Sequence, residues 1–309
     1  MVTVQSIDHY DKVHSTAITI GTFDGVHIGH RMILERIINN AKTLDLKSMV
    51  LTFFPHPRMV LQKDANIKLL NTLDEKIQIL ENLGLDHLII HPFSKDFSRL
   101  SATEFVRDVL VNKLQTKKII IGYDHRFGRN RTANITDLIT FGSTFDFEVE
   151  EISAQEIDDV SVSSTKIRGA LKNGEVQTAN AYLGYKYMLT GTVKRGKGLG
   201  RQLNFPTANL YIEETYKLIP KNGVYVVQSD IEGVTIFGMM NIGFNPTVSG
   251  KEKTIEIHFF DFDQDLYDKK LQIDIIDRLR DEHKFESLES LKKQLAKDQE
   301  SSLSIIAKL

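Results

Sequence analysis

The chain has 309 residues, of which 41% are apolar and 26% charged, so it is long enough for two domains that each bury a core. Its net charge of −2 gives no overall basic field for a nucleic-acid backbone, and no segment reaches the ~18 apolar residues of a membrane span. The absence of cysteine excludes disulfides, thiolate metal sites and cysteine nucleophiles. We expect a cytoplasmic protein without nucleic-acid or membrane partners, because the first residues also lack the apolar stretch of a signal peptide. No pattern specifies an oligomeric state.

Strand and helix signals alternate through the first half of the chain. Apolar runs that predict buried strands lie at 17–21, 48–54, 86–91, 117–122 and 147–152. A helical pattern follows the first of them. Thr72 and Glu75 have the spacing of a capping box before the next helical pattern, and so do Ser101 and Glu104. Short apolar strands that alternate with helices predict a parallel sheet covered on both faces.

The pattern changes near residue 184. Two helical pieces end the first half, with Gly174 as the C-cap of one of them. Strand patterns follow at 187–193, 223–229, 234–243, 254–260 and 270–280, and a helix is predicted from residue 287. The segment SDIEG between two of the strands predicts a hairpin connection. We therefore expect two domains, 1–184 and 185–309, and an antiparallel barrel or sandwich in the second.

The string GTFDGVHIGH, residues 21–30, follows what the sequence predicts as the first strand. In an open parallel sheet, ligands bind beyond the carboxyl ends of the strands. The glycines permit a tight turn, and the start of the next helix offers free N–H groups that suit phosphate. His27 and His30 share one face of that helix and can donate hydrogen bonds to phosphate oxygens in a pentavalent transition state. The alternative is a glycine turn with two solvated histidines.

A second segment, SSTKIR at 163–168, combines hydroxyls and two cations at a predicted helix start. Either Ser163 or Ser164 can cap this helix, and the free N–H groups there can hold phosphate. Lys166 and Arg168 can neutralise a triphosphate. Alone, such a segment is more often a simple helix cap. Together with H-x-G-H on an α/β sheet, it indicates a nucleotide site.

The pairing of these two segments resembles the nucleotidyltransferase superfamily that includes class I aminoacyl-tRNA synthetases. Within that superfamily, almost all of the first half, including GTFDGVHIGH, TFFPHPRMVL, GYDHRFG and SSTKIRGAL, resembles the FAD synthetase module of bacterial bifunctional riboflavin kinase/FAD synthetases. The resemblance implies a Rossmann-like α/β fold. It also implies a reaction in which the phosphate of FMN attacks the α-phosphate of ATP and releases pyrophosphate.

The same resemblance implies roles for single residues. His27 and His30 would bind the ATP phosphates and stabilise the transition state, and Asp124 would lie near the flavin or the α-phosphate. The other residues that the resemblance places on ATP in this module are Gly21, Phe23, Gly29, Ser164, Thr165 and Arg168. Two positions depart from the family pattern, with His125 where phenylalanine is usual and Ala133 where glycine is usual.

The second half opens with GTVKRGKGLGRQLNFPTANL, residues 191–210. Its glycines give a flexible basic loop that can fold around phosphates, although the sequence does not match the Walker A pattern. Thr207 and Asn209 stand two apart in an extended segment, so their oxygen atoms point the same way. Such oxygens suit Mg²⁺ together with phosphates. The alternative is a turn that leads into a strand.

The segment TIEIHFF alternates, with Ile255, Ile257 and Phe259 on one side. Glu256 lies on the other side and can point into a site. A carboxylate there can take a proton from an attacking hydroxyl as a general base. More often, such a glutamate only lies on a solvated face.

From GTVKRGKGLGRQLNFPTAN to the last helix, the second half resembles the riboflavin kinase domain throughout. The resemblance implies a six-stranded antiparallel barrel with a C-terminal helix. It makes Glu256 the base for the ribityl 5′-hydroxyl, and it places Thr207 and Asn209 on Mg²⁺. The residues that it places on ATP are Gly196, Gly198, Thr207 and Asn209. Arg280 and Phe285 would lie on the flavin side, and Asn204 replaces a glycine that is usual in the family.

The two halves together predict consecutive reactions on small molecules, with riboflavin, ATP, FMN and FAD as substrates and products and Mg²⁺ as the metal. The kinase would make FMN, and the adenylyltransferase would convert FMN to FAD. Three alternatives are weaker. A chain with one degenerate module conflicts with its intact motifs. A synthetase fragment that charges tRNA conflicts with the charge balance. A flavin- or nucleotide-sensing regulator would need no carboxylate base.

Overall fold

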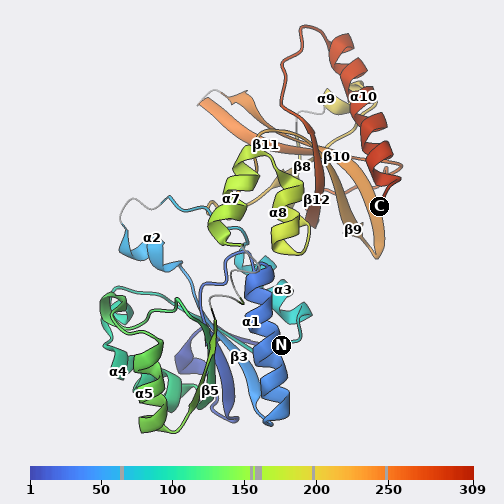
Figure 1. The fold of residues 1–309 in the computed structure, drawn as a ribbon. Coiled ribbons are helices and arrows are strands. Elements are labelled where there is room, and N and C mark those ends of the chain that lie inside the picture. The colour runs from blue at the N-terminus through green and yellow to red at the C-terminus, as the bar shows by residue number, and fades with distance from the viewer. Residues whose placement is uncertain (63–65, 154–155, 157–161, 197–198, 248–249) are drawn as a thin grey trace. The chain divides into compact units, whose positions relative to one another are not determined.

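A computed structural model describes residues 1–62, 66–153, 156, 162–196, 199–247 and 250–309 of the chain. It divides into two compact units, Met1–Ser164 and Thr165–Leu309 (Figure 1). Among the described residues, no helix combines the length and the apolar character that a membrane crossing requires.

The first unit is built on a parallel sheet of six strands in the order β1-β4-β3-β2-β5-β6. The strands are β1 (Val2–Val4), β2 (Thr16–Ile20), β3 (Lys47–Phe53), β4 (His87–His91), β5 (Thr116–Gly122) and β6 (Glu148–Ile152). Strands β2, β3 and β4 are buried along nearly their whole length, as their continuous apolar runs predict for a sheet covered on both faces.

Helices cover the sheet of the first unit. The helical segments of this unit are η1 (Ile7–His9), α1 (Ile28–Thr43), α2 (Pro57–Leu61), α3 (Leu73–Asn82), η2 (Phe97–Arg99), α4 (Ala102–Glu104), the π-helix η3 (Phe105–Lys113), η4 (Arg129–Arg131) and α5 (Ile135–Phe145). One face of β2 packs with Ile18 and Ile20 into a core that η3 and α5 complete. Helix α1 also packs against β2, as well as β3 and β5.

Strand β2 is the topological switch point of this sheet. From β2 the chain continues to β3 and β4 on one side and then returns to β5 and β6 on the other. The carboxyl end of β2 therefore lies between two connections that run in opposite directions, which is where open α/β sheets bind ligands. The string GTFDGVHIGH begins at this point.

The capping boxes predicted at Thr72–Glu75 and Ser101–Glu104 are both present. The helix after Glu104 takes the π form, in which Leu114 N–H bonds to Val109 O at 3.0 Å. The sequence patterns predict neither β1 nor α5. Strand β1 has three residues at a sheet edge, and a run that short carries little periodic signal.

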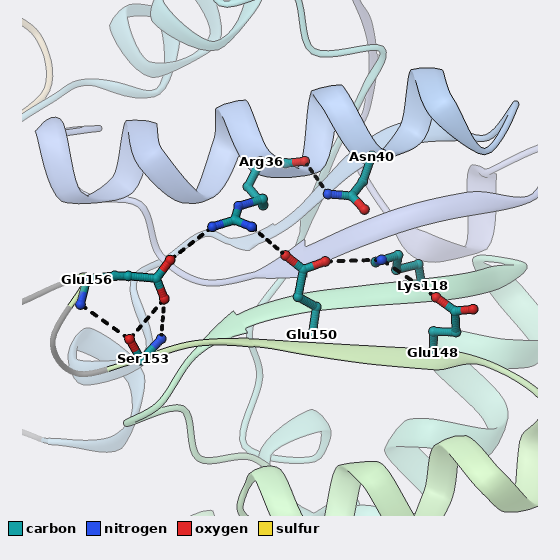
Figure 2. A network of polar contacts seen from close by, with 7 residues as sticks. All are labelled: Arg36, Asn40, Lys118, Glu148, Glu150, Ser153 and Glu156. Carbon is teal, nitrogen blue, oxygen red and sulfur yellow. Dashed lines mark hydrogen bonds and ion pairs between the residues drawn. The ribbon is translucent and has the colours of Figure 1, made fainter.

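A network of charged side chains links α1 to strands β5 and β6 and to Glu156 (Figure 2). Arg36 of α1 lies between Glu150 of β6, at 3.2 Å, and Glu156, at 2.9 Å. Lys118 of β5 adds a contact of 3.1 Å to Glu150. The Ser153 hydroxyl donates a hydrogen bond to the Glu156 carboxylate at 2.9 Å and accepts one from Glu156 N–H at 3.3 Å. Arg36 thus links the helix that begins at His27 to β6, and Glu150 continues the network to Lys118 of β5.

The second unit contains a closed barrel of six antiparallel strands in the order β10-β11-β8-β7-β12-β9. The strands are β7 (Tyr187–Lys194), β8 (Ala208–Tyr211), β9 (Gly223–Ile231), β10 (Val234–Thr247), β11 (Gly250–Phe259) and β12 (Lys270–Arg280). The predicted hairpin joins β9 to β10, where Glu232 and Gly233 both have positive φ. This closure settles the choice between barrel and sandwich in favour of the barrel.

Helices flank the barrel in this unit. They are α7 (Ser164–Asn173), α8 (Val176–Leu183), α9 (Leu199–Gln202) and the C-terminal helix α10 (Leu288–Ile306), which starts at the N-cap Ser287. Gly174 takes the left-handed conformation expected of a C-cap, with φ +86°.

The two compact units divide earlier than the predicted domain boundary of 184/185 because α7 and α8 belong by contact to the barrel unit. The side chain of Asn180 accepts a hydrogen bond from Tyr187 N–H at 2.7 Å and donates one to Ile275 O at 2.9 Å. Lys221 N–H also bonds to Leu171 O at 3.0 Å. The extents 1–184 and 185–309 of the two functional modules remain a prediction.

Candidate active sites

The first candidate site lies in the turn between β2 and α1. Three residues of this turn, Phe23, Gly25 and Val26, have positive φ, at +45°, +88° and +35°. Only glycine adopts such angles without strain, so surrounding contacts must hold the other two residues. A tightly folded turn at the switch point is consistent with the glycine pattern of the sequence.

The two histidines of this turn stack on each other. Their ring centroids are 3.6 Å apart at an interplanar angle of 17°, and the Phe23 ring meets His30 edge-on at 5.1 Å. His27 is the N-cap of α1, because its Nδ1 accepts a hydrogen bond from His30 N–H at 3.3 Å. A neutral His27 therefore carries its proton on Nε2. The histidine side chain takes the capping role that serine or asparagine usually fills.

Burial keeps both imidazoles uncharged. It lowers the pKa of His27 to about 4, against a smaller opposing effect of the Asp24 carboxylate. Burial also lowers the pKa of His30 well below its usual value, and the neighbouring His27 and Lys76 lower it further. The Nδ1 atom of His30 has no hydrogen-bond partner among the described residues. At neutral pH the pair can donate N–H groups to an anion but brings little charge of its own.

Asp24 and Lys76 hold the turn in place through hydrogen bonds, and the sequence patterns indicate no role for either residue. The Asp24 carboxylate accepts a hydrogen bond from Leu70 N–H at 2.9 Å, and the Lys76 ammonium donates one to Thr22 O at 2.7 Å. Both charged side chains are buried, at 2% and 6% exposure. Asp24 stands inside the quoted string. Lys76 is one residue of a predicted amphipathic helix, and its position in that pattern does not distinguish it from an exposed lysine.

The segment SSTKIR reaches the same turn through Ser164. The Ser164 hydroxyl donates a hydrogen bond to Asp24 O at 2.9 Å, which joins the two sequence segments that were read together. Thr165 is exposed and Arg168 half-buried, both in the first turns of α7. By contact, these two residues belong to the second unit.

The loop after β5 carries the predicted flavin contact Asp124, whose side chain is exposed. Next to it, burial lowers the pKa of His125 to about 4, and its ring stacks on Phe127 with centroids 6.2 Å apart. Ala133 pairs with Phe127 through two backbone hydrogen bonds and packs into the core. An aromatic ring and a methyl group therefore fill the two positions where the chain departs from the family pattern.

The second candidate site lies on the barrel, where β8, β11 and β10 run side by side. Glu256 pairs with Asn209 on one side and with Asn241 on the other. Directly opposed residues of an antiparallel pair have Cβ atoms ~5 Å apart, so these three polar side chains form a row. The buried positions around Glu256 alternate as predicted. The sequence analysis did not single out Asn241, since one asparagine in a strand carries no signal until the register is known.

The PTAN segment and the basic loop form the wall of a cavity of about 430 Å³. Thr207, Asn209 and Gly196 line it together with Arg195, whose guanidinium lies 4.6 Å from the ring centroid of Tyr267. His258 of β11 holds the first residue of the PTAN segment, because its Nδ1 donates a hydrogen bond to Pro206 O at 2.9 Å. These contacts hold the PTAN segment against β11.

Other predicted residues of the second unit lie elsewhere or outside the described residues. Gly198 is among those that the structure does not describe. Arg280 forms an ion pair with Asp298 of α10, at 2.7 Å from its terminal nitrogen, and its guanidinium lies 5.8 Å from the ring of Phe285. Asn204 has φ +66°, the left-handed region where the family usually has glycine.

A doubly wound sheet with H-x-G-H at its switch point defines a nucleotidyltransferase fold, and the closed barrel adds a second module. Two family models match the chain in this order. The model described as FAD synthetase matches residues 10–166, and the model described as riboflavin kinase matches residues 183–306.

Curated relatives match nearly the full length. The bifunctional riboflavin kinase/FMN adenylyltransferases of Listeria monocytogenes and Haemophilus influenzae are each 37% identical, over 94% and 93% of this chain and 92% of each relative. The enzyme of the same description from Buchnera aphidicola is 34% identical over 96% of both chains. A crystal structure described as a macrolide-efflux protein from Streptococcus pneumoniae superposes with a TM-score of 0.87 at 30% identity, over 97% of this chain and 98% of that one.

The chain belongs to the bifunctional riboflavin kinase/FMN adenylyltransferase family. It is an enzyme with two activities, FAD synthesis in its N-terminal part and riboflavin phosphorylation in its C-terminal part.

Proposed function

We propose that FMN adenylylation takes place at the turn between β2 and α1. The observation that carries this proposal is the stacked pair His27 and His30 at the start of α1, joined to SSTKIR through the bond from Ser164 to Asp24 O. Helix N-termini favour anions, and neutral imidazoles can donate N–H groups to phosphate oxygens without the desolvation of a buried charge. In this proposal Gly21, Phe23 and Gly29 line the path of the triphosphate.

The reaction needs positioning rather than a nucleophile from the enzyme. A phosphate oxygen of FMN attacks the α-phosphorus of ATP, the bond to the β-phosphate breaks, and pyrophosphate leaves. Charge builds up on the oxygens of the α-phosphate in the transition state, and donors fixed in advance stabilise it. Thr165 and Arg168 are proposed to contact the phosphates from α7, and Asp124 to lie on the flavin side.

We propose that riboflavin phosphorylation takes place at the row of polar side chains on the barrel. Glu256 would accept the proton of the ribityl 5′-hydroxyl as that oxygen attacks the γ-phosphorus of ATP. The bond between the γ-phosphorus and the oxygen that bridges it to the β-phosphate breaks, and ADP leaves. The cavity beside Thr207 and Asn209 would take the nucleotide, with Gly196 and Gly198 close to its phosphates. Arg280 and Phe285 remain the proposed flavin contacts, although Arg280 also holds α10 through Asp298.

The donor chemistry of this site fits Mg²⁺. Protein sites for Mg²⁺ with nucleotides commonly use one or two oxygens, and phosphates and water supply the others. Thr207 and Asn209 offer a hydroxyl and an amide oxygen at the edge of the cavity. A bound Mg²⁺ would neutralise charge on the phosphates of ATP. The described residues contain no group of three or more histidines and carboxylates that would hold a metal without a nucleotide.

We also propose that the enzyme works in the cytoplasm on small molecules, and that it binds neither nucleic acid nor membranes. The support is the net charge of −2, which gives no basic field, and the absence of cysteine, which fits a reducing compartment.

Chromatography of flavins tests these assignments with two variants of the full chain. Each is incubated with ATP and Mg²⁺ and either riboflavin or FMN. His30→Ala should make FMN but no FAD. Glu256→Ala should leave riboflavin unchanged and still convert added FMN to FAD. The activity that each variant keeps is an internal control for the amount of protein and for the unit that does not carry the substitution. If Glu256→Ala phosphorylates riboflavin at the normal rate, Glu256 is not the base.

A further inference from the structure

Lys76 is the feature of the first site that the proposed chemistry leaves unused. Among the described residues, it is the only lysine or arginine of the first unit that is buried, with 6% of its surface exposed. Burying an ammonium group opposes folding unless other groups compensate for its lost hydration. A methionine would fill the same space without that penalty. The position of this charge therefore needs an explanation in terms of its neighbours.

The start of helix α3 places Lys76 beside the GTFDG turn. The Thr72–Glu75 capping box starts α3, and Lys76 follows directly in the first turn of that helix. Its ammonium donates a hydrogen bond to Thr22 O at 2.7 Å, and the hydroxyl of Thr52 donates a second one to the same carbonyl at 3.3 Å. The lysine thus holds the backbone of the turn two residues before Asp24.

The charge of Lys76 acts on the histidine pair. Burial lowers the pKa of Lys76, and the Asp24 carboxylate opposes that effect. The positive charge of Lys76 in turn helps to lower the pKa of His30. His27 is itself uncharged at neutral pH, since burial lowers its pKa to about 4. The positive charge that acts on His30 therefore comes from Lys76 of α3, partly offset by the Asp24 carboxylate, and not from the imidazoles.

We infer that Lys76 is a positioning residue for adenylyl transfer, which anchors the GTFDG turn through Thr22 and supplies a fixed positive charge behind His27 and His30. Neutral imidazoles can donate N–H groups, but they do not balance the negative charge that builds up on the α-phosphate oxygens in the transition state. A buried ammonium does so over a longer range, because a low-dielectric surrounding screens it poorly. This inference rests on the proposed placement of the ATP phosphates at the histidine pair.

Two substitutions separate the charge from the hydrogen bond. Lys76→Met removes both, whereas Lys76→Gln keeps an N–H donor for Thr22 O and removes only the charge. Lys42→Gln is the matched control, because Lys42 is exposed in the last turn of α1, at the opposite end from the histidines. Steady-state release of pyrophosphate from FMN and ATP gives kcat and KM for each variant. Quenching of flavin fluorescence measures FAD binding, and riboflavin phosphorylation reports on the second unit.

We expect both Lys76 variants to lose about 100-fold in kcat, the size found when one preorganised electrostatic group is removed, with KM and FAD binding within about threefold of wild type. Riboflavin phosphorylation and the Lys42→Gln control should not change. A kcat of Lys76→Gln within about threefold of wild type would overturn the inference, since the charge would then be dispensable. Loss of FAD binding in parallel with kcat in Lys76→Gln would also overturn it, because such a result would mean that Lys76 only stabilises the folded structure.

His30→Ala, assayed in the same way, separates this inference from the site proposal. If His30→Ala keeps FAD synthesis, the phosphates are not at the histidine pair and the site proposal fails. If His30→Ala loses FAD synthesis while Lys76→Gln keeps it, only the role of Lys76 fails.

Discussion

At the scale of single residues, His27 combines two roles that are usually separate. Its Nδ1 caps α1 by accepting from His30 N–H, and its Nε2–H remains as a donor. The cap requires the neutral ring, because a protonated imidazole has no acceptor, whereas the Nε2–H donor is present in both states. The buried stack with His30 keeps the ring neutral at neutral pH. The cap therefore depends on the proton equilibrium of His27.

This dependence predicts a pH response of α1. The pKa of His27 is about 4 in the folded chain and about 6.5 when the chain is unfolded, so the unfolded state binds more protons between these values. The stabilisation by His27 is complete above pH ~6.5, and it is lost as the pH falls toward ~4, a difference of about 3 kcal/mol. Hydrogen exchange of α1 amides, corrected for intrinsic rates, measures this loss. In His27→Asn, which keeps a good N-cap, protection should fall less steeply. Equal slopes in both proteins would contradict the prediction.

Gly196 in the basic loop lies directly against the side chain of Asn209. A Cβ there would overlap the side-chain amide of Asn209, which lines the cavity. Gly196→Ala should therefore displace Asn209 and raise the KM for ATP in riboflavin phosphorylation about tenfold, a loss of ~1.4 kcal/mol of binding. Kinase assays over a range of ATP concentrations measure this change. FAD synthesis from added FMN serves as the control and should not change. A normal KM for ATP would show that Asn209 does not contact the nucleotide.

At the scale of elements, α10 is fastened to the barrel by a partly buried ion pair. Arg280 of β12 donates to both carboxylate oxygens of Asp298, and Gln294 adds a further bond to the same group. Asp298 is 3% exposed. Because the last strand and the last helix meet at this group, Arg280 has a structural role whether or not it also contacts the flavin.

Removal of the charge on Asp298 should loosen α10. Asp298→Asn keeps the shape but leaves Arg280 without its counter-charge. We expect a loss of about 2 kcal/mol, below the ~3–5 kcal/mol of a fully buried pair, because the Arg280 side chain is 18% exposed. Hydrogen exchange within Leu288–Ile306 measures it. Glu300→Gln, an exposed change on the same helix, is the control. Unchanged exchange in Asp298→Asn would mean that apolar packing alone holds the helix.

At the scale of the whole molecule, the proposed chemistry of riboflavin phosphorylation lies within the second unit. The proposed centre of FMN adenylylation lies around His27 and His30 in the first. FMN is the product of one reaction and the substrate of the other. An FMN molecule released by one chain should therefore serve another chain equally well.

Mixing two inactive variants tests this expectation. His30→Ala and Glu256→Ala should each fail to make FAD from riboflavin, but a mixture of both should make it, with FMN appearing first. Chromatography over time follows the two flavins. If the mixture makes FAD from riboflavin much more slowly than the unmodified chain, although Glu256→Ala converts added FMN at the normal rate, FMN passes mainly within one chain.

Several features could be predicted because neighbours in the sequence decide them. The capping boxes at Thr72 and Ser101 depend on residues three apart, and the alternation around Glu256 depends on residues two apart. The buried strands of the first sheet follow from continuous apolar runs. In each case the interaction that forms the element lies within one turn or one strand.

Other features could not be read in advance because they depend on distant segments. Asn241 joins Glu256 only through the register of β10 with β11, and Lys76 reaches Thr22 only once α3 packs beneath the turn. The sequence by itself determined the α/β class of the first half, the antiparallel strands of the second and the motifs, because periodicity and local spacing encode them, and the resemblance of those motifs indicated the family. Only the tertiary structure decided that α7 and α8 join the barrel, and that a buried lysine stands behind the histidines. Burial and charge at those places are set by residues far apart in the chain.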